Sequence, residues 1–409
     1  MVLLRSISAT TARSLGATAG VLLFALVACS SSSEAPAGNE GLEGGAPGTD
    51  GSTDGQVSTT DGALADTSAP LPACTAGNIG AVTGARGGDT AVYERASYDY
   101  APAVMLDGAT YKMWWCGGIA GDHILYAEAT APSGPWHKFG SNVAGTFDDV
   151  FQPTDNATTF DGLHTCDPSV VKVSGTYYLY YGGFPKPGAR QQVTMLGVAS
   201  GTTGRAFTRL ANGNPIVMPA RDPTTVPNSY GAGQPSVIFL DGWFYLMFTD
   251  TTGSGANTTN GGGQFVWRSV DPAFQAGVEE LQGAGFVPAA SAVTRSFSLV
   301  EAFSADWAFS DVLGKFAVAT DGRPSIIDVR FYASTLSSTV VGTAELAASW
   351  TEGPGLVRTA EGHLPAGARC EDVVLDILRP IGTSGAPDTW NLAHVGGTIA
   401  SGVNCPCKH

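Results

Sequence analysis

The chain has 409 residues and a net charge of −15 at pH 7, from 36 acidic and 21 basic residues. This balance argues against a nucleic-acid partner, because sequence-independent binding to nucleic acid needs a basic face. Glycine and proline are abundant, at 54 and 24 residues, and helix-period patterns are few. The composition therefore predicts an all-β fold with a core of substantial size.

The N-terminal 28 residues read as a secretion signal. Arg5 and Arg13 carry its charges, and an apolar run covers residues 21–28, which is too short for a good membrane-spanning helix. Residues 26–29, Leu-Val-Ala-Cys, resemble the lipobox of bacterial lipoproteins. This resemblance implies cleavage before Cys29 and acylation of Cys29, whereas the alternative is an ordinary signal peptide with a chance cysteine. We expect an exported lipoprotein anchored to the outer membrane or the cell surface.

Residues 29–72 contain seven acidic residues, no basic residue and no aromatic residue. Such a segment cannot bury enough apolar surface to offset the entropy of ordering it. We predict a disordered, acidic Ser/Gly-rich tether between the anchor and one domain at residues 73–409, which is expected to be a monomer.

The domain contains a repeated hairpin pattern. Its clearest copy starts at Asp167-Pro168-Ser169, continues through a Ser-Gly turn at 174–175 and ends in an aromatic run at 177–181. Pro168 is expected at the start of the first strand, because proline cannot donate to a strand ladder. Similar or weaker copies align on Pro102, Pro235, Trp307 and Asp372, and successive copies are 65–72 residues apart.

A sustained repeat of this length predicts a five-bladed β-propeller with four-stranded blades. The fifth unit is short, and the piece at 73–98 supplies about the missing length. The N- and C-terminal segments are therefore predicted to share one blade, which closes the ring and removes its free edges.

With Cys29 assigned to lipid, an even set of cysteines remains, which predicts three disulfides with 15 possible pairings. We expect Cys74 to pair with Cys405 or Cys407, because this bridge would lock the shared blade. A zinc site is the alternative, although no Cys-x-x-Cys pair supports it. The remaining cysteines are Cys74, Cys116, Cys166, Cys370, Cys405 and Cys407.

The Asp167-Pro168-Ser169 phrase, with Gly-Thr-Tyr-Tyr-Leu-Tyr-Tyr at 175–181, resembles glycoside hydrolase family 43, the β-xylosidase and arabinanase family. It also resembles the five-bladed propeller glycosidases of families 32, 62, 68 and 130. The resemblance covers residues 99–250 and, more weakly, extends to 380. It implies three carboxylates at the inner ends of different blades: a general base or nucleophile, an Asp that orients and tunes the pKa, and a Glu that acts as the general acid.

Under this resemblance Asp167 matches the orienting Asp, but Gln234 stands where the acid is expected, and glutamine cannot protonate a leaving group. Other acids lie near the predicted blade openings. The candidate catalytic residues are Asp167, Asp99, Glu301 and Glu371, and the candidate substrate-binding residues are His164, Gln234, Asp306, Asp372 and Trp115. The alternatives without a functional role are a strand cap for Asp167, a solvent-exposed loop acid for Asp99 and packing between blades for Trp115.

Two functions remain open. The first is a cell-surface glycosidase that acts on xyloside- or arabinofuranoside-type bonds of polysaccharides or oligosaccharides. The second is a propeller without catalysis, which binds a glycan or a partner protein after losing the acid at Gln234. No cofactor and no metal is expected, apart from a structural axial ion that His164 is placed to contact.

Overall fold

The computed structural model describes residues 79–93, 98–118, 121–140, 143–144, 148–189, 192–290, 295–323, 325–369, 371–383 and 389–401. These residues form an all-β structure with two 3₁₀ turns, η1 (Ala211–Gly213) and η2 (Pro223–Thr225). No helix of this described part is long and apolar enough to cross a bilayer. The predictions for the signal, the tether, Cys29, Cys74, Cys370, Cys405 and Cys407 fall outside the described residues.

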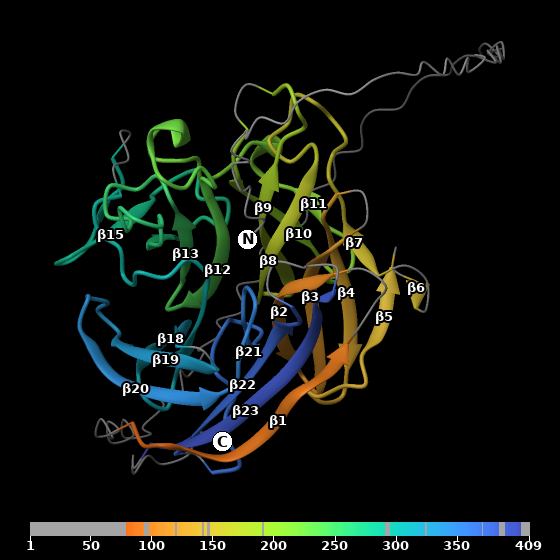
Figure 1. Ribbon diagram of the computed structural model, residues 1–409, viewed down its shortest axis with the longest axis vertical. Helices are drawn as coiled ribbons and strands as arrows, with labels where there is room; N and C mark the ends of the chain where they lie inside the picture. The colour runs from red at the N-terminus through yellow and green to blue at the C-terminus, as the bar shows by residue number, and fades with distance from the viewer. Residues whose placement is uncertain are drawn as a thin grey trace, which may run out of the picture. The chain divides into compact units, whose positions relative to one another are not determined.

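Five inner strands organise the domain. Each contacts the next in the order β2, β8, β12, β17, β21 and again β2. The sheets that contain them follow one another around a common centre (Figure 1). Residues far apart in sequence therefore meet where these strands open. The five strands are β2 (Asp99–Asp107), β8 (His164–Val173), β12 (Ala232–Leu240), β17 (Ala305–Ser310) and β21 (Gly355–Thr359).

The predicted hairpins are confirmed at the first three inner strands, which pair antiparallel with β3 (Thr110–Gly117), β9 (Thr176–Phe184) and β13 (Trp243–Asp250). The turn at Ser174-Gly175 has φ values of 49° and 83°, and the turn at Asp241-Gly242 has 51° and 83°. Two successive positive φ values are typical of type I′ turns, whose twist matches that of the flanking strands.

The sheets differ in strand number. Those of β8 and β17 have four strands, as predicted, whereas that of β12 has five. The sheet that begins at β2 continues through β3 and β4 to three short strands. The remaining strands of these sheets are β4 (His123–Ala129), β5 (His137–Gly140), β6 (Val143–Ala144), β7 (Asp149–Phe151), β10 (Met195–Gly201), β11 (Thr208–Arg209), β14 (Gln264–Ser269), β15 (Glu279–Gln282), β16 (Gly285–Pro288), β18 (Lys315–Arg323), β19 (Ile326–Ala333) and β20 (Val340–Ala347).

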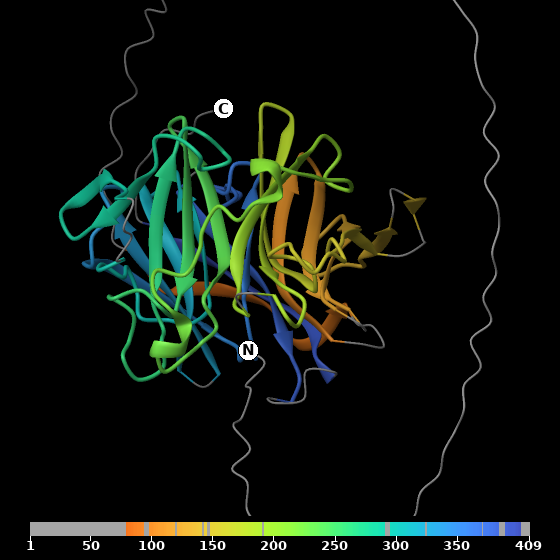
Figure 2. The ribbon, with the colours of Figure 1, turned by 90° about the horizontal axis from the view of Figure 1, so that it is seen from above.

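Strands from both ends of the chain share one sheet, as the sequence predicted. β1 (Val82–Tyr93) pairs antiparallel with β23 (Asn391–Ala400), which pairs with β22 (Asp372–Ile381), which pairs with β21. Orange β1 lies beside blue β23 in Figure 1, and Figure 2 agrees. A short parallel pairing of β21 with β2 joins this sheet to the next.

The alignment of the fifth unit on Asp372 is wrong. Asp372 begins β22, the second strand of its sheet, and the inner strand is β21, which follows Gly353-Pro354. β21 and β22 are antiparallel, and Gly355 lies opposite Leu378, so Asp372 is at the other end of the sheet from the start of β21. The short β21 lacks the apolar-turn-aromatic pattern by which the other hairpins were located.

Five apolar clusters form the core, and each lies between two neighbouring sheets. Trp114 and Tyr181, for example, join the sheets of β2 and β8, while Trp115 and Leu378 join the first and last sheets. Burial in these seams stabilises the arrangement of the sheets and thereby fixes the inner strands that open on the candidate site.

Candidate functional site

Three of the inner strands carry the same irregularity. The pairings of β2, β8 and β12 each skip register around an X-Pro pair: Ala101-Pro102, Asp167-Pro168 and Gln234-Pro235. The residue before proline has φ of 48°, 47° and 50° in the three cases. The strands thus begin before the proline rather than at it, because a β-bulge accommodates the missing N–H group. Bulges also redirect side chains, and they recur next to active sites.

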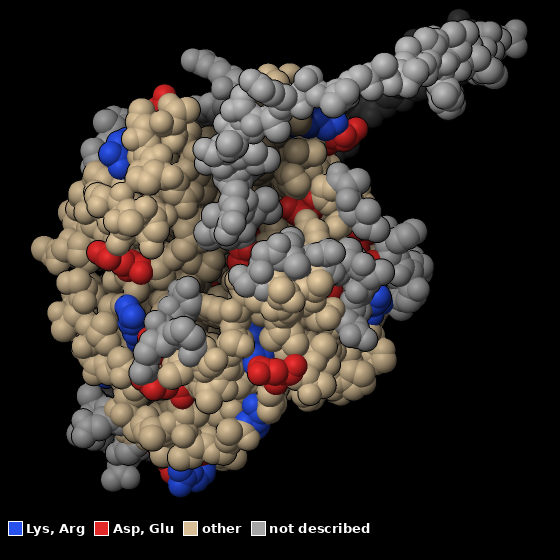
Figure 3. All heavy atoms as spheres, viewed as in Figure 1, with Lys and Arg blue, Asp and Glu red and all other residues tan. Residues whose placement is uncertain are grey.

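A pocket lies where the five inner strands open. Its volume of about 30 Å³ holds one or two water molecules, so a sugar ring would have to lie above it. Within the described surface that faces the viewer in Figure 3, acidic atoms are visible in the central hollow. The lining residues are Ala101, Pro102, Ala103, Asp167, Pro168, Gln234, Pro235, Ser304, Ala305, Asp306, Gly353 and Pro354.

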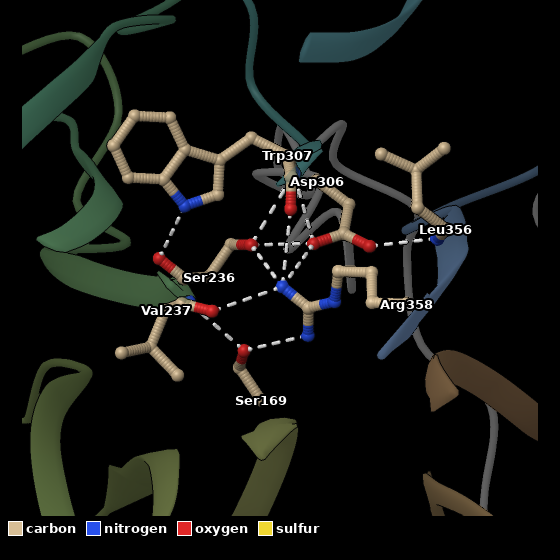
Figure 4. Close-up of polar contacts among 7 residues, drawn as sticks. All are labelled: Ser169, Ser236, Val237, Asp306, Trp307, Leu356 and Arg358. Atoms are coloured by element: carbon tan, nitrogen blue, oxygen red, sulfur yellow. Dashed lines mark hydrogen bonds and ion pairs between the residues drawn. The ribbon is translucent and has the colours of Figure 1, made fainter. Parts of the chain in front are cut away.

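Asp306 lines this pocket, but its carboxylate is occupied by the fold (Figure 4). The N–H groups of Trp307 and Leu356 donate to it at 2.9 and 2.7 Å, and the Ser236 hydroxyl donates as well. The Arg358 guanidinium lies 3.4 Å away and is 2% exposed. Asp306 therefore stabilises the meeting of three sheets and has little capacity left for a ligand.

Arg358 extends this network across the centre. Its Nη1 donates to the Ser236 hydroxyl at 3.2 Å and to the carbonyls of Val237 and Trp307 at 3.1 Å each. Its Nη2 donates to the Ser169 hydroxyl at 3.2 Å. These partners come from β8, β12 and β17, and the guanidinium thus ties four inner strands together at the axis (Figure 4).

Gln234 also lines the pocket, and its amide is held in place. Its Nε2 donates to the Ser304 hydroxyl at 2.7 Å, and the Thr249 hydroxyl donates to its Oε1 at 2.8 Å. Ala101 and Gly353 occupy the equivalent openings of β2 and β21 without a functional side chain. Asp167 is therefore the acidic lining residue, within the described part of the chain, that no cation neutralises.

Asp167 lies in an environment suited to a protonated carboxyl group. The Tyr230 hydroxyl donates to its Oδ2 at 3.0 Å, and its Oδ1 is 3.5 Å from Cys166 Sγ. Burial raises the pKa of Asp167 to about 6, and the neighbouring charge of Asp122 adds to this, although Tyr230 opposes both. Burial, followed by the charge of Asp167, also raises the pKa of Tyr230 and of Tyr100, so both phenols remain donors.

Asp122 is a second carboxylate near Asp167, buried and outside the pocket lining. It lies between β3 and β4, and the hydroxyls of Tyr98 and Tyr100 donate to it, the latter at 3.4 Å. His164 Nδ1 is 2.9 Å from Asp122 Oδ2 and 3.0 Å from its backbone nitrogen. His164 therefore holds Asp122 through one ring nitrogen, which is within hydrogen-bond distance of both its carboxylate and its backbone.

A disulfide lies between the two carboxylates. It joins Cys116 of β3 to Cys166 of β8, with Cα atoms 5.0 Å apart, and the Tyr100 hydroxyl is 2.8 Å from Cys166 Sγ. The sulfurs of Cys116 and Cys166 and a carboxylate oxygen of Asp122 lie within 4.8 Å of one another. This spacing would suit a metal, but sulfurs bonded in a disulfide are not the thiolates that zinc binds. The sequence had left the cysteine pairing open, and the structure shows this bridge between Cys116 and Cys166.

The structure corrects two candidates on β2 and β3. Asp99 is fully buried, outside the pocket lining, and accepts a hydrogen bond from Trp115 Nε1 at 2.8 Å. Trp115 is also fully buried and packs against Tyr93 with ring centroids 4.6 Å apart. Both residues stabilise the seam between the first and last sheets, so Trp115 cannot stack on a sugar.

Three further acids are separate from the pocket. Glu301 is exposed, outside the lining, and lies 3.3 Å from the Asn257 amide. Glu371 and Asp372 pair with Arg369, at 3.4 and 2.8 Å, at the far end of the last sheet. The predictions that Glu371 and Asp372 open an inner strand are therefore wrong. Among the predicted residues, Asp167, Gln234 and Asp306 line the pocket together, whereas His164 is outside the lining and contacts Asp122.

Sequence reasoning missed Asp122, Tyr230 and Arg358. Asp122 directly precedes β4 in the loop after β3, a position to which the repeat assigned no role. Tyr230 precedes β12 by two residues, and Arg358 lies within an apolar run. For Arg358, the sequence did contain a signal: Gly353-Pro354, directly before β21, repeats the X-Pro pair found near the start of β2, β8 and β12.

No protein-family model matches the chain, and no curated protein matches it. Among solved structures, a family 117 glycoside hydrolase of Zobellia galactanivorans superposes with a TM-score of 0.50 at 11% identity, over 79% of this chain and 91% of the other. The chain thus shares the fold of a propeller-type glycoside hydrolase.

Two α-L-arabinofuranosidases match with lower scores. That of Podospora anserina, solved with cellotriose, has a TM-score of 0.42 at 13% identity and covers 81% of this chain and 98% of its own. The catalytic domain from Coprinopsis cinerea has a TM-score of 0.45 at 14% identity, over 81% and 99%.

Proposed function

We propose that residues 73–409 form a five-bladed β-propeller that hydrolyses glycosidic bonds. The circular order of β2, β8, β12, β17 and β21, the five apolar seams and the sheet shared by both chain ends support the five blades. The fold likeness to the family 117 enzyme supports the propeller. The finer resemblance to family 43, with xyloside- or arabinofuranoside-type substrates, remains part of the proposal.

The chemistry requires one proton donor and one anionic carboxylate near the scissile bond. We assign the proton donor to Asp167, whose proton passes to the glycosidic oxygen as the bond to the anomeric carbon breaks. Asp122 is the anionic partner, which either attacks the anomeric carbon or removes a proton from the attacking water. The phenols of Tyr100 and Tyr230 hold the two carboxylates by donating hydrogen bonds.

One observation carries this proposal: Asp167 lines the pocket and has a pKa of about 6, while Asp122 beside it is surrounded by hydrogen-bond donors. A buried carboxyl group with a raised pKa beside a second carboxylate is the arrangement that acid catalysis at neutral pH needs. Asp306 lines the same pocket but is neutralised by Arg358, so it does not enter the assignment.

The test is hydrolysis by the purified domain of aryl-xylosides, aryl-arabinofuranosides and the corresponding oligosaccharides. We expect turnover by the wild-type protein and a loss of about 10²-fold or more in kcat for Asp167→Asn and for Asp122→Asn. Proton NMR of the first product gives the stereochemistry and so distinguishes attack by Asp122 from attack by water. Unchanged kcat in both variants would refute the assignment.

A second candidate function is glycan binding without catalysis. It is favoured by Ala101 and Gln234, which occupy two of the bulge positions where the resemblance expects carboxylates. The two functions separate in calorimetry and turnover on the same oligosaccharides. Binding that Asp167→Asn weakens, with no product from the wild-type protein over long incubation, would favour the binding propeller; product would exclude it.

Export and anchoring through Cys29 complete the proposal, supported by the apolar run and Leu-Val-Ala-Cys at 26–29. We expect the mature protein to partition into detergent and to carry acyl chains. Cys29→Ser should release the domain or stall its processing. Unchanged membrane association of this variant would rule out the lipid anchor.

A further inference from the structure

The Cys116–Cys166 disulfide crosses the seam between two sheets at the candidate site. Cys116 lies near the end of β3, and Cys166 is the third residue of β8. Asp122 comes from the loop that follows β3, and Asp167 directly follows Cys166. The two carboxylates thus belong to different sheets, and the disulfide is the covalent link between those sheets among the described residues.

We infer that this disulfide is a positioning element that holds Asp122 and Asp167 at a fixed separation across the seam. The inference rests on the proposed function, in which these two residues act together. Cys166 Sγ is 3.5 Å from Asp167 Oδ1, and a carboxylate oxygen of Asp122 lies within 4.8 Å of both sulfurs. The Tyr100 hydroxyl contacts both Cys166 Sγ and Asp122 Oδ2, at 2.8 and 3.4 Å. The bridge and Tyr100 thus link the two carboxyl groups across the seam, while the Thr165 N–H donates to the Asp122 carbonyl at 2.9 Å and holds the backbone of Asp122 to β8.

The surroundings of Asp167 show what opening the bridge would change. The ionisable groups that act on it are Tyr230 from the segment before β12, Asp122 from the loop before β4 and Tyr100 from β2. His164 of β8 contacts Asp122 rather than Asp167, at 2.9 Å. The disulfide itself contributes a buried, apolar wall. Without it, water enters and Asp122 can move away, and both changes favour the ionised form of Asp167.

The experiment removes the bridge and measures Asp167 directly. In Cys116→Ala/Cys166→Ala, carbon-detected NMR of aspartate-labelled protein follows the carboxyl of Asp167, assigned by its disappearance in Asp167→Asn. We expect its pKa to fall from about 6 toward the ordinary 3.8, by about one unit or more. An unchanged pKa in the folded variant would overturn the inference.

A matched control breaks another contact between the same strands. At the opposite end of β2, Asp107 accepts from Lys112 of β3 at 2.6 Å and from Lys172 of β8 at 3.0 Å. Asp107→Asn should lower the melting temperature but leave the pKa of Asp167 unchanged. If Asp107→Asn lowers that pKa as much as loss of the disulfide does, the bridge merely stabilises the seam, and the positioning role is refuted.

A second variant keeps the disulfide and covers the case in which the double variant does not fold. Asp122→Asn removes the neighbouring negative charge, so the pKa of Asp167 should fall if the bridge holds the two acids within range. An unchanged pKa would overturn the inference. The NMR readout does not require turnover: a wild-type protein that fails to hydrolyse any glycan, but shows these shifts, refutes the proposed function and leaves the positioning role intact.

Discussion

Asp167 and Asp306 lie at comparable openings of inner strands and line the same pocket, yet their surroundings are opposite. Asp306 accepts from two backbone N–H groups and a hydroxyl and faces the Arg358 guanidinium. Asp167 accepts from a neutral phenol and faces a second carboxylate, Asp122. Position in the repeat brings an acid to the axis, but the neighbouring charge decides whether it stabilises the fold or is left able to exchange a proton.

The largest change in stability is expected from breaking the buried ion pair of Asp306 and Arg358. Arg358→Met removes the cation and leaves Asp306 buried without its counter-charge, with four inner strands losing a shared donor. Removing one partner of a buried ion pair costs about 3–5 kcal/mol. We expect a loss of this size in the free energy of unfolding, measured in guanidinium chloride.

The control for Arg358 is Arg369→Ala. Arg369 also pairs with an aspartate, Asp372 at 2.8 Å, but its side chain is 62% exposed, and water screens the pair. No measurable change in unfolding is expected. If Arg358→Met loses no more unfolding free energy than Arg369→Ala, the ion pair of Asp306 and Arg358 does not stabilise the fold as described.

A smaller effect of opposite sign is expected at Asp167. Its folded-state pKa of about 6 lies above the ordinary 3.8, so the folded protein binds the proton more tightly, and its stability falls as pH rises from about 4 to 6. Asp167→Asn removes this penalty. At pH 8 the variant should exceed the wild-type protein by on the order of 3 kcal/mol in unfolding free energy, relative to their difference at pH 3.5.

Denaturant unfolding at these two pH values, with the same buffer ions, measures the effect. Asp107→Asn is again the appropriate comparison, because Asp107 is paired with Lys112 and Lys172. A stability difference between Asp167→Asn and the wild-type protein that does not grow with pH would mean that Asp167 has an ordinary pKa and no special environment.

The hairpins of β8 and β12 were predictable from sequence because their turn residues, Ser174-Gly175 and Asp241-Gly242, act locally. The pairing of β1 with β23 followed from the length of the two end pieces. β21 was missed because a five-residue strand after Gly353-Pro354 has too little pattern to be found. The length of the repeat, rather than its local signals, placed the fifth unit incorrectly on Asp372.

The site was less predictable than the fold, because its decisive contacts join residues far apart in sequence. Arg358 neutralises Asp306 from another sheet, and Tyr230 and Asp122 reach Asp167 from segments that the repeat did not mark. The burial of Asp167 and the charges around it depend on residues from several segments, which cannot be recognised from the sequence of one strand. The sequence therefore singled out Asp167, as the orienting Asp of the resemblance rather than as a proton donor, but not its partners.

The smallest effect is expected at the closed end of the axis. There the turn around Gly362 forms backbone hydrogen bonds with β8, β12 and β17. His363 Nδ1 lies 2.9 Å from Asp311 Oδ2, and its Nε2 lies 2.9 Å from the Phe239 carbonyl. Burial lowers the pKa of His363, but these hydrogen bonds outweigh it and raise the pKa overall.

A raised histidine pKa contributes stability that is present below 6.5 and is lost as pH rises through the folded-state value. His363→Gln should therefore cost more unfolding free energy at pH 5.5 than at pH 8.5. Because Asp311 is 66% exposed, solvent screening keeps this difference below about 1 kcal/mol. Thermal unfolding at both pH values checks it, and an equal cost at both would show that His363 stays neutral.

The most direct test compares Asp167→Asn with Asp306→Asn in one experiment, measuring unfolding free energy and glycan turnover or binding for each. We expect Asp167→Asn to lose function while its stability at pH 7 stays at or above that of the wild-type protein. Asp306→Asn should lose stability, because Arg358 is then buried without its counter-charge, and should keep function at temperatures where it is folded. Full function in Asp167→Asn, or a folded Asp306→Asn that is equally inactive, would contradict the account.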